Sequence, residues 1–443
     1  MLARTFALLC LSLLACGDDH AAPDAAVADA PVVDAPPPLL TAQEEAAIHT
    51  LSPLPAVPPD PTNAYADNAA AARLGQMLFF DKSYAGALAV ADDGTNGGLG
   101  VIGATGKVSC HSCHAVGSSS LDDRRSKPNN VSLGTDYGSR NALGLVNSSF
   151  YAWTNWGGRF DSQWSLPLAV GENPKIMNSS RLQIAHLLYD KYRTEYDATF
   201  PVPLDTRLVD SSVFAAAGKP GAAAYDSLST ADKAIIDRIF ANYGKAIAAY
   251  LRLLVSGDAP FDRFVAGDRA AISASAVRGL KLFLAKGCIG CHAGPNFADS
   301  AFHALGVPQT GPHVPAADLG RNADVPGLLA SPFNTTGAFS DNTATGRLTG
   351  LVQDDSQKGT FRTKSLRNVA ETGPFMHSGQ LATLADVIDL YDRGGDAVAA
   401  GVTKDPRMVP LMLSVQDKLD LVEFLRTLTG GPLPVPTIVD TSK

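Results

Sequence analysis

Two short segments carry the cysteine and histidine residues best placed for chemistry. Residues 110–114 read Cys-His-Ser-Cys-His, and residues 288–292 read Cys-Ile-Gly-Cys-His. Two thiols three residues apart share one helical turn and can form thioethers to both vinyl groups of one porphyrin, and the histidine that follows can bind its iron. Each segment therefore predicts one covalently bound haem c. The attachment and iron-binding residues of the two groups are expected to be Cys110, Cys113, His114, Cys288, Cys291 and His292.

Two other uses of paired cysteines stay open at this point. Four cysteines in an exported protein can form two disulfides, and Cys-x-x-Cys pairs can bind zinc. Disulfide frameworks stabilise small scaffolds, whereas this chain has 443 residues, of which 45% are hydrophobic. A zinc site built from two distant pairs leaves the histidine after each pair unexplained. Haem attachment is therefore the favoured interpretation.

The first residues of the chain predict export and lipid attachment. Arg4 supplies a positive charge, and residues 6–14 form an apolar stretch that is too short to cross a bilayer. Residues 13–16, Leu-Leu-Ala-Cys, resemble a lipobox, so residues 1–16 are expected to be a lipoprotein signal peptide, with Cys16 as the lipidated N-terminus. An ordinary signal peptide cleaved nearby is the alternative. Because Gly17 rather than aspartate follows the cysteine, we expect the protein on the periplasmic side of the outer membrane.

The charge of the chain argues against one class of partner. The net charge is −8 and the isoelectric point is about 5.6, which disfavours binding to nucleic acid. An acidic surface is compatible with docking of a small basic electron donor. No apolar run after the signal peptide is long enough for a transmembrane helix, so we expect membrane contact only through the lipid on Cys16.

The sequence pattern after the signal peptide predicts an all-α fold. Residues 17–40 are nearly all Ala, Pro, Asp and Val and are expected to form a disordered tether. Apolar residues then recur at helical spacing in several segments, which loops rich in Gly, Asn, Asp and Ser separate. The expected helices cover residues 70–80, 181–192, 229–254, 274–286, 383–391 and 416–428, and the expected loops cover 83–107, 117–140 and 303–360.

The positions of the two boxes predict two tandem domains. Each box follows a helix that ends in a Leu-Phe segment, at residues 74–80 and at residues 280–283. The two halves therefore look like a duplicated haem-binding unit. We expect two tandem cytochrome c-type haem domains with long irregular loops. Their expected bounds are 41–258 for the N-terminal domain and 259–431 for the C-terminal domain, followed by a tail at 432–443.

Several ordered strings within residues 51–430 match one known family. They are LSPLP at 51–55, RLGQMLFFD at 73–81, SRNA at 139–142, WGGR at 156–159, SGDAPFDRF at 256–264, CIGCHAGPNF at 288–297, KSLRNVA at 364–370 and FMHSG at 375–379. Through these strings the chain resembles bacterial di-haem cytochrome c peroxidases and their relative MauG, which oxidises residues on another protein.

The resemblance implies roles for residues outside the boxes. In this family, two helical cytochrome c folds hold a calcium ion between them, and a tryptophan bridges the haems. Trp156 stands at the bridging position, although WGGR replaces the usual Trp-Asp-Gly-Arg. Asn141, Thr372 and the carbonyl of Pro374 match the calcium ligands, an all-oxygen set that suits a hard cation. Without the resemblance, Trp156 would be interpreted as a core residue and the other three as turn or cap residues.

The iron ligands opposite the proximal histidines depart from the peroxidase pattern. No histidine occurs between residues 115 and 185, so the resemblance implies that the His114 haem has an open sixth position for peroxide. At the second haem the peroxidases of the family place a methionine, whereas the matching helix here carries Tyr391, as in MauG. Tyr391 is the favoured ligand, and Met376, Met408 and Met412 are the competing ones.

A third departure concerns the group that moves protons between the peroxide oxygens. Family members carry a distal glutamate in an Asn-Pro-x-Glu-Met string, and groups of this kind accelerate reactions by ~10²–10⁴. In this chain Ile176 occupies the position of that glutamate. Glu172 lies four residues earlier and is the candidate catalytic replacement. A solvated loop carboxylate is the alternative interpretation of Glu172.

The resemblance implies an enzyme, a cytochrome-c peroxidase-like oxidoreductase. We expect it to reduce hydrogen peroxide to water at the N-terminal haem, with electrons relayed through Trp156 from the C-terminal haem. The donor is expected to be a small periplasmic cytochrome c or copper protein. The alternatives are a MauG-like oxidase that modifies a partner protein, and a non-catalytic electron-transfer or redox-sensing cytochrome. A homodimer is one assembly that the sequence allows.

Overall fold

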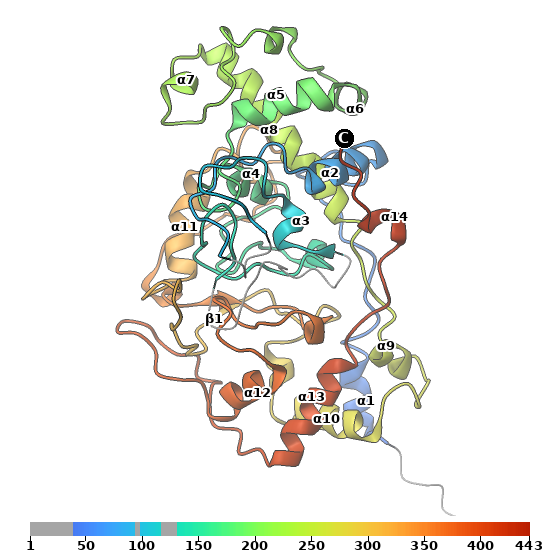
Figure 1. The fold of residues 1–443 in the computed structure, drawn as a ribbon. Helices are drawn as coiled ribbons and strands as arrows, with labels where there is room; N and C mark the ends of the chain where they lie inside the picture. Colours follow the sequence, from blue (N-terminus) through green and yellow to red (C-terminus); the bar gives the residue numbers. More distant parts are fainter. Residues whose placement is uncertain (1–38, 94–97, 117–130) are drawn as a thin grey trace, which may run out of the picture. The chain divides into compact units, whose positions relative to one another are not determined.

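Helices joined by long loops form the body of the protein, as the sequence predicts (Figure 1). The computed structural model describes residues 39–93, 98–116 and 131–443, so the expected signal peptide, Cys16 and nearly all of the expected tether lie outside the described residues. The α-helices are α1 (Ala42–Ile48), α2 (Ala69–Phe80), α3 (Cys110–Cys113), α4 (Ser165–Glu172), α5 (Arg181–Lys191), α6 (Arg193–Thr199), α7 (Ala223–Asp226), α8 (Thr230–Leu251), α9 (Pro260–Val265), α10 (Ala274–Ala285), α11 (Arg321–Ala330), α12 (Leu384–Asp392), α13 (Val415–Arg426) and α14 (Val435–Ile438). Within the described ranges the strands form one small antiparallel sheet, in which β1 (Phe302–His303) pairs with β2 (Phe361–Arg362).

Serine caps explain where three of the long helices begin. The hydroxyls of Ser229, Ser273 and Ser414 each accept a hydrogen bond from the backbone N–H three residues later, at the starts of α8, α10 and α13. The six expected helices correspond to α2, α5, α8, α10, α12 and α13, with ends that agree to within about three residues. Local sequence therefore determines most of the helical framework.

The expectation of a continuous loop over residues 303–360 is wrong at α11. This helix contains Pro326, which has no N–H to donate to the carbonyl of Asn322 and which normally interrupts a helix. In the structure, the side-chain amide of Gln353 donates to the Asn322 carbonyl instead, at 3.1 Å. A contact from outside the helix therefore compensates for the proline, and the local sequence gave no sign of it.

The buried apolar side chains fall into two large clusters. One cluster is built on α2, α4, α5 and α8, and the other on α1, α9, α10, α12 and α13. Figure 1 shows the helices of each cluster lying together. Along the chain, the first cluster reaches Leu254 and the second resumes at Phe261, although Phe333 also joins the first cluster. The expected domain bounds remain predictions, because the contacts group residues Leu40–Lys443 into one unit.

Each cluster contains a close helix pair with a glycine at the crossing. A Cβ atom added to Gly75 of α2 would lie 1.9 Å from a backbone carbonyl oxygen of α8. A Cβ atom added to Gly279 of α10 would likewise lie 1.9 Å from a backbone carbonyl oxygen of α13. Both glycines stand three residues before a Leu-Phe pair in the helix that precedes a Cys-x-x-Cys-His box. In both clusters, therefore, a glycine allows the helix before the box to pack closely against the backbone of its neighbour.

None of the helices within residues 39–93, 98–116 and 131–443 is both long enough and apolar enough to span a membrane.

Candidate haem-binding sites

The first Cys-x-x-Cys-His box forms one helical turn, α3, that ends at its histidine. Ser109 caps this turn, and its backbone N–H donates to the Ser112 hydroxyl at 3.0 Å. The Nδ1 atom of His114 lies 2.8 Å from the carbonyl oxygen of Leu143. An N–H at Nδ1 leaves Nε2 free to bind a metal, and burial lowers the pKa of His114 to about 4, which favours the neutral ring.

The second box repeats this arrangement with different partners. Its cysteines lie in and beside a short 3₁₀ turn (Cys288–Gly290), and the Nδ1 atom of His292 lies 3.0 Å from the carbonyl oxygen of Phe297. Burial lowers the pKa of His292, so its Nε2 atom is also available as a neutral ligand. In both boxes, a backbone carbonyl fixes the ring nitrogen that does not bind metal.

The four described cysteines form no disulfide with one another. The structure therefore contains neither of the two disulfides of the alternative interpretation, and the sulfur atoms are available for thioether bonds. In the described part of the chain, the group of side chains that could hold a metal is Cys291, Asp299 and His303. This group does not join the two boxes, as a shared zinc site would require.

A cavity of about 530 Å³ adjoins the second box. Cavities that hold cofactors and drug-sized ligands are typically ~300–1,000 Å³ and mostly apolar. The box residues lie in its wall together with apolar side chains of α10 and α12 and with Tyr391. The wall includes Trp156, Phe283, Cys288, Cys291, His292, Leu384, Ile388 and Tyr391. The thiols, the oriented histidine and the apolar wall fit a covalently attached haem.

Tyr391 lies in α12 and faces this cavity. Burial, together with the nearby Cys288 and Cys291 thiols, raises the pKa of Tyr391 well above its usual value, and the described chain gives its hydroxyl no hydrogen-bond partner. Among the competing ligands, Met376 and Met408 also line the cavity, whereas Met412 is 84% exposed. Ligation by Tyr391 stays a prediction, and Met412 is the competitor that the structure disfavours.

Trp156 forms another part of the same cavity wall. Its side chain is buried, and its indole N–H donates to the carbonyl oxygen of Asn141 at 2.8 Å. The ring of His377 lies edge-on to the indole, with 6.4 Å between the ring centroids. The structure thus brings Trp156 to the wall of the second haem site, while its role as a bridge between haems stays a prediction.

The three predicted calcium ligands also line this cavity. The Nδ2 atom of Asn141 donates to the carbonyl oxygen of Pro374 at 2.8 Å, and the Thr372 hydroxyl donates to the carbonyl oxygen of Val369 at 3.0 Å. Asn141 and Pro374 are therefore adjacent. Rotation of the Asn141 amide would direct its oxygen toward the same point as the Pro374 carbonyl, which fits an oxygen-seeking cation. Calcium binding itself stays a prediction.

Three polar side chains beside Trp156 were not identified from the sequence. The guanidinium carbon of Arg362 lies 3.6 Å from the ring centroid of Tyr151, and the Nζ atom of Lys364 lies 4.8 Å from it. The same Nζ atom lies 5.7 Å from the Trp156 ring centroid. Burial tends to raise the pKa of Tyr151, but the charges on Lys364 and Arg362 outweigh burial and lower this pKa to about 8. The sequence signal that could have identified the two cations is the pair of basic residues at alternating positions, 362 and 364.

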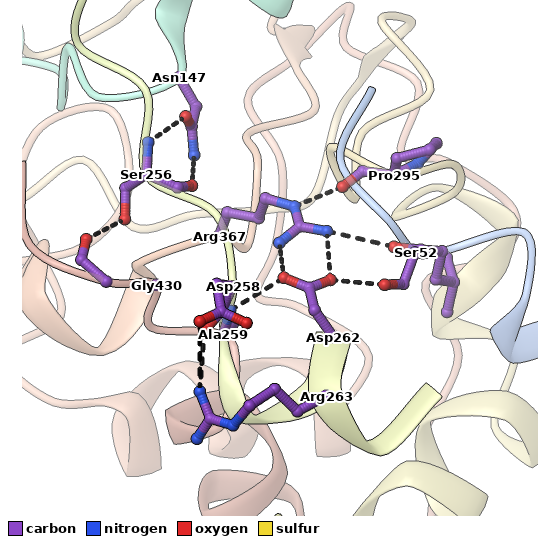
Figure 2. A network of polar contacts seen from close by, with 12 residues as sticks. Ser52, Asn147, Ser256, Asp258, Ala259, Asp262, Arg263, Pro295, Arg367 and Gly430 are labelled. Atoms are coloured by element: carbon purple, nitrogen blue, oxygen red, sulfur yellow. Dashed lines mark hydrogen bonds and ion pairs between the residues drawn. The ribbon is translucent and has the colours of Figure 1, made fainter. Parts of the chain in front are cut away.

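A buried ion pair anchors the segment that carries these cations. The Arg367 guanidinium donates to both carboxylate oxygens of Asp262 at 2.8 and 2.9 Å, and to the carbonyl oxygen of Pro295 (Figure 2). The Ser52 hydroxyl donates to the same carboxylate at 2.6 Å. Arg367 thus connects the KSLRN string to α9 and to the loop after the second box.

Glu172 is held in an ion pair with Arg181. Its two carboxylate oxygens accept from Nε and Nη2 of Arg181 at 2.9 and 2.8 Å, and Asp237 binds the same guanidinium at 2.6 Å. Use of Glu172 as a proton shuttle would require this pair to break, and the role stays a prediction. Ile176 is half-buried against the first cluster and brings no ionisable group. A pairing across nine residues and a turn could not be foreseen from local sequence.

Comparisons with known proteins cover most of the chain. A family model described as di-haem cytochrome c peroxidase matches residues 69–270. The cytochrome-c peroxidase IdrP1 of Denitromonas iodatirespirans is 32% identical over 416 residues, which are 91% of this chain and 91% of that protein. The chain belongs to the di-haem cytochrome c peroxidase family. Membership implies two c-type haems and oxidoreductase chemistry.

Two further comparisons connect this family member to MauG. The methylamine utilization protein MauG of Methylorubrum extorquens is 36% identical over 195 residues, which are 43% of this chain and 44% of that protein. A solved structure described as a MauG-like protein associated with microbial copper homeostasis has a TM-score of 0.60 at 24% identity. It covers 88% of this chain and 98% of its own, and it shows the shared fold.

The structure explains one departure of this chain from the family pattern. Gly157 stands where the family usually has aspartate after the bridging tryptophan. A Cβ atom at Gly157 would lie 2.1 Å from a carboxylate oxygen of Asp324, which reaches this point from α11. Asp324 also binds Arg140 at 2.7 Å, next to the Asn141 carbonyl that Trp156 contacts. A carboxylate from α11 therefore occupies the space beside Trp156 that a side chain at 157 would need.

Proposed function

We propose that the protein is a periplasmic oxidoreductase that reduces hydrogen peroxide to water at the N-terminal haem, with electrons relayed from the C-terminal haem. The observation that carries this proposal is the cavity at the second box, whose wall extends from His292 and Tyr391 to Trp156. A continuous wall of this kind supports passage of electrons from the second haem toward the indole. Family membership supports peroxidase-like or MauG-like redox chemistry.

The side chains of this chain prepare the first site for that reaction. A c-type haem supplies an iron that can bind peroxide and exchange electrons when it is attached at a Cys-x-x-Cys-His box. The Leu143 carbonyl orients His114, whose neutral Nε2 atom would hold the iron. Residues 115–185 contain no histidine that would compete with peroxide for the iron. Two electrons and two protons convert one hydrogen peroxide into two waters.

Trp156 is proposed to relay the electrons. An indole is oxidisable and can divide one long transfer into two shorter ones. Its N–H is fixed by the Asn141 carbonyl, which in turn lies beside the proposed calcium ligands. Asn141, Thr372 and Pro374 are proposed to bind one Ca²⁺ between two tandem cytochrome c-type domains. Elemental analysis of the dialysed protein tests this: less than about half an equivalent of calcium would refute the ion site.

The proposed location follows from Cys16, which lies outside the described residues. We propose that lipid on this cysteine anchors the protein to the periplasmic side of the outer membrane. Labelling cells with a radioactive fatty acid tests the anchor. Label on the unmodified protein that disappears in Cys16→Ala supports it, whereas label that survives the substitution contradicts it.

A MauG-like oxidase is the second candidate, favoured by one observation. Tyr391 faces the cavity without a hydrogen-bond partner in the described chain, which leaves its phenol oxygen available to iron, and MauG carries tyrosine at the matching position. In this version the electrons come from side chains of a partner protein rather than from a small donor.

A donor-oxidation assay distinguishes the two functions. Hydrogen peroxide is mixed with the holoenzyme and a reduced, basic small cytochrome c, and oxidation of the cytochrome is followed optically. The peroxidase predicts rapid oxidation of two cytochromes per peroxide, and a loss of tenfold or more in Trp156→Phe. A holoenzyme that binds both haems and leaves the cytochrome reduced would refute the peroxidase proposal.

A further inference from the structure

Two cations of the second haem cavity, one buried and one half-buried, have no carboxylate partner in the described chain. Arg362 is 3% exposed, and Lys364 lines the same cavity. The guanidinium of Arg362 donates to the backbone carbonyls of Asn155 and Thr363 at 3.4 and 3.3 Å, both long distances. In the described chain, the phenol of Tyr151 is the acidic group beside both cations, and no Asp or Glu pairs with them. Buried charges are strongly unfavourable unless they are paired, so this arrangement calls for an anion.

The other cations of the cavity lining already have partners. Arg367 pairs with Asp262, Arg407 pairs with Asp405 at 2.7 Å, and Lys286 donates to a backbone carbonyl at 2.7 Å. The requirement for an anion is therefore confined to Arg362 and Lys364. Arg362 is the last residue of β2 and Lys364 lies two residues further on, and in extended backbone alternating residues carry their side chains to one face.

We propose that Arg362 and Lys364 bind the two propionate carboxylates of the haem attached at Cys288 and Cys291. A haem carries two propionates, so two negative charges meet two positive charges. Guanidinium and ammonium groups are the donors that proteins use for carboxylates. The backbone of Lys364 contacts His292, which places this residue at the second haem. The proposal needs only the covalent haem and holds whichever substrate the protein uses.

This pairing has a consequence for the reduction potential of the C-terminal haem. A cation beside a propionate cancels a negative charge near the iron and so favours the reduced, ferrous form. Loss of one cation leaves a carboxylate uncompensated in a low-dielectric cavity, where charges act strongly. The reduction equilibrium of this haem should therefore move toward the ferric form in a Lys364 variant.

Spectroelectrochemical titration of the holoenzyme tests the proposal. Lys364→Met should lower the reduction equilibrium constant of the C-terminal haem about tenfold, which is about 59 mV for one electron. Lys364→Arg keeps the charge and should stay within about threefold of the unmodified protein. Lys286→Met is the matched control, because it removes a cation of the same cavity that already has a backbone acceptor, and it should change the equilibrium by less than threefold.

Two results would overturn the proposal. One is a change in the reduction equilibrium constant that is no larger in Lys364→Met than in Lys286→Met. The other is a change in this constant that is as large in Lys364→Arg as in Lys364→Met. Such a result would mean that the shape of the lysine side chain matters and its charge does not. Arg362→Met and Arg362→Lys repeat the test at the second position. If Arg362→Met fails to accumulate with both haems attached, the Lys364 series decides alone.

Discussion

The ion pair between Arg367 and Asp262 offers a sharp test of how the C-terminal part of the protein is held together. Arg367→Met removes a guanidinium whose side chain is 1% exposed and leaves the Asp262 carboxylate, which is 9% exposed, without its main partner (Figure 2). Removing one member of a buried pair costs about 3–5 kcal/mol, because the remaining charge stays buried. We expect the free energy of unfolding of this part to fall by that amount.

A double-mutant cycle separates the ion pair from packing. Asp262→Leu combined with Arg367→Met leaves no buried charge, so the double variant should be more stable than the sum of the two single effects by about 0.5–3 kcal/mol. Arg426→Met is the matched control, because its pair with Glu423 is exposed and pairs of this kind contribute about 0–1 kcal/mol. Urea unfolding of the holoenzyme, followed by circular dichroism, measures all four variants. Two results would refute the reasoning: strictly additive losses of unfolding free energy in the double variant, or a loss in Arg367→Met as small as that in Arg426→Met.

The same pair predicts a dependence on pH. Burial tends to raise the pKa of Asp262, but hydrogen bonds from Arg367 and Ser52 outweigh burial and hold this pKa below its usual value. The stabilisation is therefore complete above the ordinary carboxyl pKa of about 3.9 and is lost as the pH falls through the lower folded value. Without Arg367, burial raises the pKa of Asp262, so the stability difference between the unmodified protein and Arg367→Met should shrink as the pH falls from neutral toward that acidic window.

Three further predictions concern the haem sites and the helices that hold them. Ile176→Glu restores a carboxyl where the family has one, so peroxide turnover should rise by up to ~10²–10⁴, as measured with a reduced cytochrome donor; unchanged turnover would show that this position is not distal. Gly279→Ala forces α10 away from α13 and should cost about 1–3 kcal/mol in urea unfolding, whereas Gly327→Ala in α11, where an added Cβ meets no atom, should not destabilise. Tyr391→Phe removes the proposed phenol ligand, so the absorption spectrum of the ferric C-terminal haem should change; an identical spectrum would favour Met376 or Met408.

Local sequence predicted the helices well because their signals are local. Serine caps and apolar spacing fixed the starts of α8, α10 and α13, and the Leu-Phe repeats before the boxes pointed to a duplicated unit. The helix α11 was missed because Pro326 is tolerated only through the long-range contact between Gln353 and the Asn322 carbonyl. Prediction succeeded where neighbouring residues decide the structure and failed where a distant side chain does.

The candidate sites show the same contrast between features that neighbouring residues determine and features that distant residues determine. Both boxes could be recognised from residue spacing, but the carbonyls of Leu143 and Phe297 that orient their histidines could not, because any residue type supplies a carbonyl. The binding of Glu172 by Arg181 depends on how the turn between α4 and α5 folds back. The resemblance identified Trp156, whereas the cations beside it became visible in the structure only because no carboxylate of the described chain pairs with them.

Tyr391 and Lys364 should tune the C-terminal haem in opposite directions. A phenolate ligand favours the ferric state, as in tyrosine-ligated haems, while a cation beside a propionate favours the ferrous state. Tyr391→Phe should therefore raise the reduction potential of this haem, and Lys364→Met should lower it. Because one change acts at the iron and the other at the ring edge, the double variant should lie near the sum of the two shifts. A double variant whose potential equals that of Tyr391→Phe alone would mean that Lys364 acts through the phenolate and not through the propionates.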